Sequence, residues 1–359
     1  MKMLRLGLEP RRHAPRYVQV LGLAFSLFLA LLAIAIVFLA LGVNPVYAYQ
    51  RIFQGGFGSL YGLAESATKS IPLMLAGVGL ALAFRARVYN IGAEGQLLMG
   101  AIVGGGIALN FSELPRAWLL PAMFVGGFLG GALWALIPAI LKARFRVDEV
   151  LTTLMLVYVA SDFVRYLVNG PWRGPEQRGF PYSSPFSLNA QLPHLGVTRI
   201  HYPTLIIAIL VAILLFLLLV RTKLGYEIRV AGENPAAARY AGMNTQKIVL
   251  LVLLISGGLA GLAGVGEVAG IHARLSPPEG ISPGYGFTAI IVAWLARLNP
   301  LAAILTSFLI SGLLVGGDAI QVALNLPSAT IHIFNGVILL FVIAGDLFTR
   351  YRIRLEARS

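Results

Sequence analysis

Few ionisable or amide side chains interrupt the apolar stretches of this chain, so those few indicate what chemistry it can perform. Glu65 and Lys69 are four residues apart in one apolar run, in the order that favours pairing on a helix face. A second interruption, Asn90-Ile91-Gly92-Ala93-Glu94-Gly95-Gln96, offers two amides and a carboxylate in a glycine-rich break. Ionisable groups at membrane depth are candidates for function, whereas amides suit hydrogen bonding to an uncharged solute.

Both interruptions also have a structural interpretation. Pairing of Glu65 with Lys69 would hold helices in register, and residues 90–96 would form an ordinary cytoplasmic turn, which the basic residues Arg85 and Arg87 favour. An observation against an ordinary turn at residues 90–96 is that a polar break is costly in lipid unless it lines a cavity or reaches water. Transporters often place substrate sites at such breaks. If so, we expect Asn90 to cap the following helix and Glu94 to lie at its positive end.

The sequence argues against bond-making chemistry in this chain. It has no cysteine, and its histidines show neither metal-ligand spacing nor a catalytic arrangement with serine and aspartate. It also has no G-x-x-x-x-G-K-[ST] phosphate loop. We therefore expect no metal and no cofactor here, and any nucleotide-driven step requires an ATPase on another chain. The histidines are His13, His194, His201, His272 and His332.

The segment Leu224–Gly242, LGYEIRVAGENPAAARYAG, is a long polar interruption with its own helix signals. Asn234 is a good N-cap, Pro235 suits the first helical position, and Gly242 can adopt the left-handed conformation that ends a helix. Three alanines between them favour a helix, so we predict one at 234–241. A helix this short is only marginally stable by itself, so we expect it to pack against a partner. The alternative interpretation is a surface loop with one helical turn.

These residues must be positioned by membrane-spanning helices. The chain has 359 residues, of which 58% are hydrophobic and 12% charged, against roughly 25% charged in a soluble domain. Several apolar runs reach the ~20 residues that cross a bilayer. We predict an all-α polytopic membrane protein with about ten transmembrane helices, of which 284–296 is short, broken or re-entrant. The spans are 20–43, 60–84, 94–110, 117–141, 147–169, 203–220, 247–271, 284–296, 299–317 and 328–349.

Lysine and arginine indicate the orientation, because they are enriched on the cytoplasmic side. With the N-terminus inside, the cytoplasmic segments hold 20 of these residues and the outer loops hold 6. Both termini are then cytoplasmic, which also explains the net charge of +13. The predicted organisation is a basic cytoplasmic N-terminus at 1–19, a transmembrane permease domain at 20–349 and a cytoplasmic tail at 350–359. The domain contains a cytoplasmic coupling segment at 221–247 and an outer loop at 170–202.

Glycines spaced four residues apart occur repeatedly within the expected spans. Such small-xxx-small pairs let helix backbones approach closely in lipid, so they predict a tightly packed bundle. The pairs are Gly126/Gly130, Gly127/Gly131, Gly257/Gly261, Gly266/Gly270 and Gly312/Gly316.

Two motifs resemble a known family. The tract IPLMLAG at 71–77 through AFRARVYNIGAEGQLLMGA resembles the signature of ABC-transporter permeases of the branched-chain amino acid, ribose and nucleoside superfamily. Its NIGAEGQ form is most similar to the nucleoside, guanosine-type uptake branch. GYEIRVAGENPAAARYAGMN resembles the family's cytoplasmic coupling segment, and ISGGLAGLAGVGEVAG and GYGFTAIIVAWLARLNPLAAI continue the resemblance over roughly residues 60–345. Ala296-Arg297 departs from the Leu-Gly pair common in relatives, which leaves the shape of that turn open.

The resemblance implies the transport subunit of an importer rather than an enzyme. Its partners would be cytoplasmic ABC ATPase subunits carrying ATP and Mg, a second permease chain of different sequence and an extracytoplasmic substrate-binding lipoprotein. The location would be a bacterial-type plasma (inner) membrane, with no nucleic acid involved. The residues expected to couple to the ATPase are Glu233, Asn234, Pro235, Ala237, Ala238, Arg239, Tyr240 and Gly242. Those expected to line the path of a neutral nucleoside are Asn90, Glu94, Gln96, Phe287, Trp294 and Asn335.

Other functions remain open at this point. The chain could be a permease of the same superfamily for a sugar or a branched-chain amino acid. It could also be an ion-coupled secondary transporter that works alone, with Glu65, Lys69 or Glu267 as the coupling group. An intramembrane enzyme is disfavoured because the sequence suggests no nucleophile–base pair.

Overall fold

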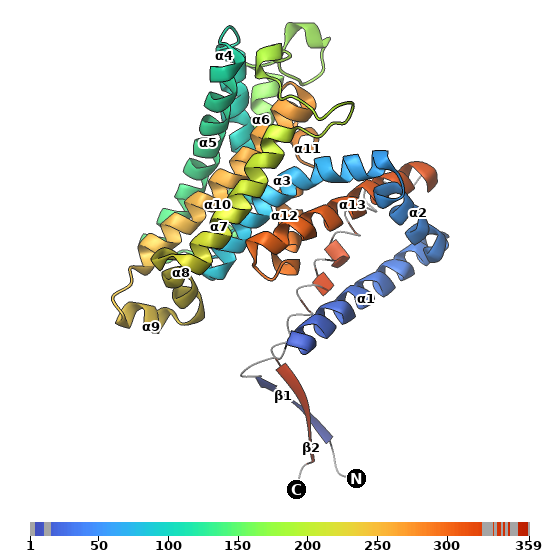
Figure 1. Ribbon diagram of the computed structural model, residues 1–359, viewed down its shortest axis with the longest axis vertical. Helices are drawn as coiled ribbons and strands as arrows, with labels where there is room; N and C mark the ends of the chain where they lie inside the picture. The colour runs from blue at the N-terminus through green and yellow to red at the C-terminus, as the bar shows by residue number, and fades with distance from the viewer. Residues whose placement is uncertain are drawn as a thin grey trace. The chain divides into compact units, whose positions relative to one another are not determined.

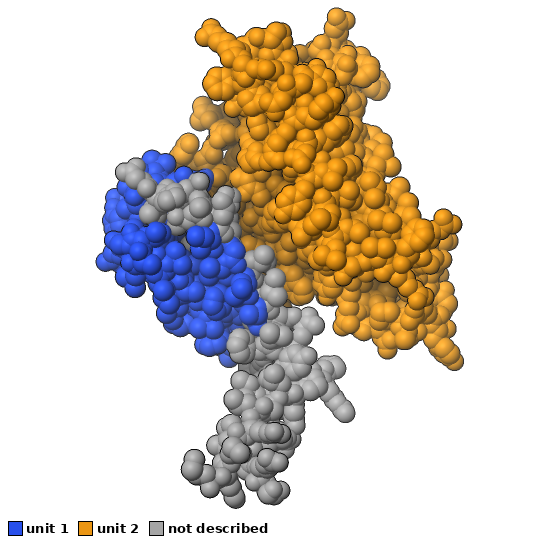
Figure 2. All heavy atoms as spheres, turned by 180° about the vertical axis from the view of Figure 1, so that it is seen from behind, with its two compact units in different colours: residues 1–53, 317–359 blue, residues 54–316 orange. Residues whose placement is uncertain are grey.

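The computed structural model describes residues 4–10, 16–324, 333, 336–338, 340–341, 344 and 351–357. The chain divides into two compact units, one of residues 1–53 and 317–359 and the other of residues 54–316 (Figure 2). Asn335 and most of the expected span 328–349 lie outside the described residues.

The larger unit is a helical bundle that contains nearly all of the predicted functional residues (Figure 1). Its core is α10, which packs against α5, α4 and α3, while α12 and α7 pack against α3. The elements in order are α3 (Leu60–Arg85), α4 (Ala93–Asn110), α5 (Arg116–Phe145), α6 (Glu149–Asn169), η1 (Pro175–Gln177), η2 (Leu188–Ala190), α7 (Tyr202–Arg221), α8 (Lys223–Glu233), α9 (Pro235–Tyr240), α10 (Thr245–Glu267), the π-helical η3 (Val268–His272), α11 (Pro278–Ile281), α12 (Tyr285–Leu295) and α13 (Pro300–Leu324), which continues into the smaller unit.

Six of the described helices are long and apolar enough to cross a membrane, or up to seven if the bent pair of α1 (Arg16–Ala40) and α2 (Pro45–Phe57) counts as one span. They are α3, α5, α6, α7, α10 with η3, and α13. In the most apolar 18-residue stretch of α3, 89% of the residues are buried inside the protein. The corresponding share is 28% in α6 and in α7, so the apolar side chains of these two helices suit contact with lipid. The polytopic helical prediction is confirmed, whereas the count of ten spans is not. The segment expected to be short is short: α12 has 11 residues.

Glycines bring α4, α5 and α10 into backbone contact. A Cβ added to Gly261 would lie 2.1 Å from the carbonyl oxygen of Gly127, and one added to Gly131 would lie 2.2 Å from that of Gly257. Because Gly127 meets Gly261 while Gly131 meets Gly257, the two helices run antiparallel. Gly100 of α4 closes the junction, since its added Cβ would lie 2.2 Å from the Cα of Gly261. The predicted close packing of glycine pairs is therefore present between α5 and α10.

The smaller unit holds α1 (Arg16–Ala40), the larger part of α2 (Pro45–Phe57) and the end of α13. It also contains a two-stranded antiparallel sheet, in which β1 (Leu4–Pro10) pairs with β2 (Tyr351–Ala357), Leu4 opposite Ala357. The sequence analysis predicted helices and basic tails, so this sheet is an addition to the expected all-α fold. Both strands come from the tails, and their pairing joins segments more than 300 residues apart, which local patterns do not reveal.

A long loop joins α6 to α7 at the residues expected for the outer loop, and its side of the membrane stays a prediction. It is ordered by hydrogen bonds to the irregular chain that follows α10. The backbone N–H groups of Ser183, Phe186 and Leu192 donate to the carbonyls of Leu275, Ala273 and Ala269 at 2.7–3.0 Å. The π-helical end of α10 leaves carbonyl groups without helical partners, and the loop supplies donors for them.

Candidate functional site

The short helix α9 forms as the sequence predicts. The side-chain oxygen of Asn234 accepts from the N–H groups of Ala236 and Ala237 at 3.1 and 3.0 Å, and Pro235 is the first helical residue. At the other end, Gly242 has a φ of +76°, and the N–H of Met243 donates to the carbonyl of Ala238 at 3.0 Å. This hydrogen-bond pattern is a Schellman C-cap. Both ends of α9 are therefore determined by the nearby residues.

The same helix has one buried anchor and an otherwise exposed surface. Ala238 is fully buried, whereas Ala237, Arg239 and Tyr240 are exposed, and the tyrosine is 97% exposed. Figure 1 shows α8 and α9 at one end of the larger unit, away from α11 and the loop between α6 and α7. An exposed aromatic side chain on a small-residue helix suits docking to another protein.

The break before α4 contains a buried hydrogen-bond network. Asn90 is fully buried, and its amide nitrogen donates to the Oε1 of Gln96 at 2.8 Å and to the Oγ of Ser256 at 3.0 Å. Its Oδ1 accepts from the Nε2 of Gln96 and from the N–H of Gly92. Both hydrogens of the Asn90 amide are used, so these contacts join the α3–α4 connection to α10. Lining of the solute path by Asn90 and Gln96 remains a prediction.

The start of α4 differs from the expectation in one respect. The residue that caps α4 is Gly92, and Asn90 bonds to the N–H of Gly92 itself, so Asn90 is not the N-cap. Glu94 does lie in the first turn of α4, where its Oε2 accepts from the N–H of Gly286 at 2.6 Å. Gly286 is in the first turn of α12, so one carboxylate lies beside the positive ends of two helices.

The two expected aromatic residues lie on α12 in different surroundings. Trp294 contacts Phe84 of α3, with ring centroids 5.9 Å apart and the planes tilted by 37°, and Phe84 also contacts Tyr89. Phe287 is 37% exposed. The structure thus places Trp294 in an aromatic cluster next to the break before α4. Whether either ring contacts a transported solute stays a prediction.

Glu65 has a partner that the sequence analysis missed. Arg199, from the loop before α7, lies 3.4 Å from the carboxylate of Glu65. The expected pair of Glu65 with Lys69 stays a prediction. Nothing local relates Arg199 to Glu65, because they are separated by 134 residues. Ser256 was missed as well; its only local signal is a hydroxyl within an apolar span.

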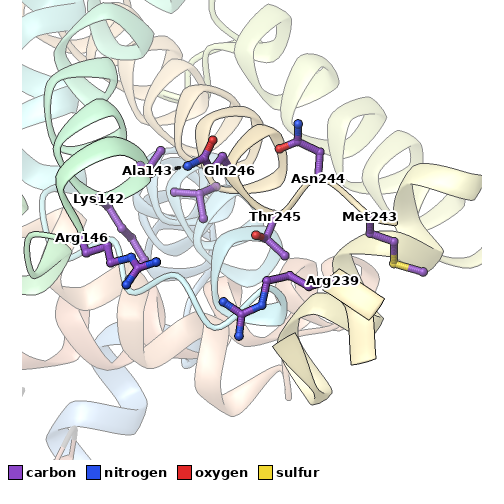
Figure 3. A pocket seen from close by; sticks show the side chains of 9 residues that line it. Lys142, Ala143, Arg146, Arg239, Met243, Asn244, Thr245 and Gln246 are labelled. Carbon is purple, nitrogen blue, oxygen red and sulfur yellow. Dashed lines mark hydrogen bonds between the residues drawn. The ribbon is translucent and has the colours of Figure 1, made fainter. Parts of the chain in front are cut away.

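A basic pocket lies beside α9 (Figure 3). It has a volume of about 390 Å³ and lies between the end of α5, the loop after α9 and the start of α10. Three of its lining residues are cations. The lining consists of Lys142, Ala143, Arg146, Arg239, Met243, Asn244, Thr245, Gln246 and Val249.

Comparison with known proteins identifies the family. The model of the family described as "Branched-chain amino acid transport system / permease component" matches residues 62–343. The chain belongs to this permease family. A glucose ABC transporter permease from Haloferax volcanii is 37% identical to this permease over 98% of the chain and 94% of the relative. A guanosine ABC transporter permease from Bacillus subtilis is 32% identical over 88% and 91%, respectively. A nucleoside ABC transporter permease from Lactococcus lactis is 28% identical over 90% of each chain.

Membership of this family accounts for the chemistry of the site. ABC permeases are transport subunits and not enzymes, so this permease needs no catalytic side chains. The described part of the chain contains no group of three or more histidine or acidic residues that could hold a metal ion. Its polar features are the buried hydrogen-bond network around Asn90 and the exposed surface of the internal helix α9.

Proposed function

We propose that this permease is the membrane-spanning subunit of an importer for a nucleoside, driven by separate ATPase chains through α9. The exposed surface of α9 carries this proposal. Its ends are fixed by caps and its Ala238 is buried, so force applied to the exposed residues is transmitted to the bundle. The rigid junction of α10 with α4 and α5 would then transmit the motion to the solute path.

The proposed assembly follows the family resemblance. ATP and Mg are held by the ATPase chains, a second permease chain of different sequence completes the path, and an extracytoplasmic lipoprotein delivers the solute. In the proposed orientation both termini are cytoplasmic and α9 lies on the ATPase side of a bacterial-type plasma membrane. Glu233 and Asn234 begin the docking surface, and Tyr240 supplies its aromatic contact.

A nucleoside is supported by the NIGAEGQ heptad and by two relatives with guanosine or nucleoside in their names. The proposed path contains amides and aromatic rings, which suit a neutral solute with hydroxyl groups and a ring. The glucose permease relative favours a second candidate, a hexose, because it is more similar in sequence. Both solutes are neutral and carry hydroxyl groups, so the two candidates require a direct comparison.

The coupling test changes one exposed methyl group on α9. Ala237→Arg introduces a long charged side chain on the docking surface, and we expect loss of ATPase co-purification and of uptake with normal membrane insertion. Ala117→Arg makes the same change at an exposed position at the start of α5 and should leave both intact. Uptake at the normal rate by Ala237→Arg would disprove the role of α9.

The substrate test measures competition for uptake by the complete transporter. Guanosine and adenosine should compete, whereas ribose and leucine should not. Competition by glucose without competition by guanosine would establish the second candidate instead. Proteoliposomes containing only this chain and an ion gradient should show no uptake, and uptake there would indicate a secondary transporter.

A further inference from the structure

Two arginines of the basic pocket are not neutralised within the protein. Among the described residues, neither Arg146 nor Arg239 makes an ion pair or a hydrogen bond through its side chain, whereas Lys142 is paired with Glu149. Figure 3 shows the two guanidinium groups reaching into the same space, Arg146 from the C-cap of α5 and Arg239 from α9. The nearby acid Asp148 is already engaged in capping α6. The pocket thus has two uncompensated positive charges.

The pocket lies at the level where two spanning helices end. α5 ends at Phe145 and α10 begins at Thr245, and these helices pack antiparallel along their glycines. Residues at the last turn of one span and the first turn of the other therefore lie at a membrane–water interface. This is the level of lipid headgroups, and the start of α10 adds the positive end of a helix.

Apolar side chains are found both in the pocket and on the exposed surface of α5. Val249 lines the pocket itself, and on α5 the side chains of Phe145 and Ile140 are 67% and 40% exposed. Such residues on a spanning helix can contact acyl chains, while arginines bind phosphate oxygens through paired N–H donors. A cationic headgroup site with an adjoining apolar surface has the chemistry of an anionic phospholipid.

We propose that the pocket bounded by Arg146 and Arg239 binds the headgroup phosphate of an anionic phospholipid. A carboxylate of a partner protein is the alternative occupant. The lipid is favoured because the pocket lies between the ends of two spans, and because Arg239 is the one exposed residue of α9 in its lining, whereas Ala237 and Tyr240 do not line it. A bound lipid would fix α9 against α5 and α10. This proposal does not depend on which solute is transported.

The test measures binding of phosphatidylglycerol to the purified full-length chain in a non-ionic detergent, through the rise in melting temperature. Phosphatidylglycerol should stabilise the chain, whereas phosphatidylcholine and inorganic phosphate at equal phosphate concentration should not. Arg146→Gln should weaken the apparent affinity about tenfold, because one charge-assisted contact is lost. Arg144→Gln is the matched control, since Arg144 is exposed in the last turn of α5, two residues before Arg146, and does not line the pocket.

Additional variants distinguish a bound lipid from a partner carboxylate and from a general effect of charge. Arg146 has a φ of +57°, so Arg146→Asn, which tolerates this conformation, serves as a second variant if Arg146→Gln does not fold. Ala237→Arg should bind the lipid normally even where ATPase association is lost, which separates this proposal from that of the coupling helix. Unchanged affinity in both Arg146 variants, an equal loss in Arg144→Gln, or equal stabilisation by inorganic phosphate would overturn the lipid site. Loss of ATPase association in an Arg146 variant that still binds lipid would assign the pocket to the partner carboxylate.

Discussion

The glycine junction between α10 and α5 yields the most direct prediction, for Gly261→Ala. The added Cβ would lie 2.1 Å from the carbonyl oxygen of Gly127 and 3.1 Å from the Cα of Gly131. Real Cβ atoms essentially never approach another heavy atom within 3.0 Å, so the backbones must separate by roughly 1 Å. Neither contact is a side chain that could rotate away.

Two opposing effects determine the size of the change. Alanine favours a helix over glycine by about 1 kcal/mol, whereas overpacking at a rigid contact costs about 1–3 kcal/mol, or more. In lipid, helices associate mainly through close packing, so separating α5 from α10 also weakens their other contacts. We expect a net loss of about 2 kcal/mol in the free energy of unfolding.

The assay is thermal unfolding of the purified chain in detergent, followed by tryptophan fluorescence. Trp134 on α5 donates to the carbonyl of Leu156 on α6 at 3.3 Å, so its fluorescence should report the loss of packing around α5 on unfolding. Gly105→Ala on α4 is the control, since its added Cβ would meet only the Phe186 ring at 3.3 Å and Leu275 at 3.8 Å. It should change stability by less than about 1 kcal/mol. If Gly261→Ala is as stable as the wild type or more stable, helix propensity outweighs the close approach and the reasoning is refuted.

Three further predictions concern buried or strained positions. Asn90→Ala leaves the partners of a fully buried amide without hydrogen bonds, so it should lower the free energy of unfolding by about 2–3 kcal/mol. Ser256→Ala removes only one of these hydrogen bonds and should lower it by about 1 kcal/mol. Equal losses for the two variants in denaturation assays would contradict the network. Burial, with smaller effects of His194 and Arg199, lowers the pKa of His201 to about 3. Because the unfolded chain then takes up the proton first, the contribution of His201 to stability is lost as the pH falls below about 6.5. Between pH 8 and pH 5 the wild type should therefore lose about 2 kcal/mol more than His201→Gln, as measured by melting at both pH values. Arg297 is exposed and has a φ of +55°, a left-handed conformation that glycine adopts more readily than arginine. Arg297→Gly should therefore raise the free energy of unfolding by about 0.5–1 kcal/mol. A lower melting temperature of this variant would show that the arginine makes a compensating contact.

The turn around Arg297 shows where the sequence left the local shape open. Ala296 ends α12 in right-handed geometry, and two successive non-glycine residues, Arg297 and Leu298, take left-handed conformations before Asn299 caps α13. Non-glycine residues rarely adopt this conformation, so residue preference did not indicate it. The conformation follows from the short connection between two packed helices.

Local features were predictable because their causes lie within a few residues. The position of α9 follows from Asn234, Pro235 and Gly242, whose hydrogen bonds reach at most a few residues along the chain. The apolar runs similarly predicted the helices of the bundle, because a bilayer requires length and hydrophobicity that are readable from the sequence. The family motifs likewise identified the transporter class, which the family match confirmed.

The tertiary structure alone decided which distant residues meet. Asn90 contacts Ser256 across 166 positions, Glu65 contacts Arg199 across 134, and the two pocket arginines reach one space from α5 and α9. The sequence determined that these polar groups would need partners, because unpaired polar atoms are costly away from water. Their identity depended on how closely the glycine-bearing helices approach, which is a property of packing in three dimensions.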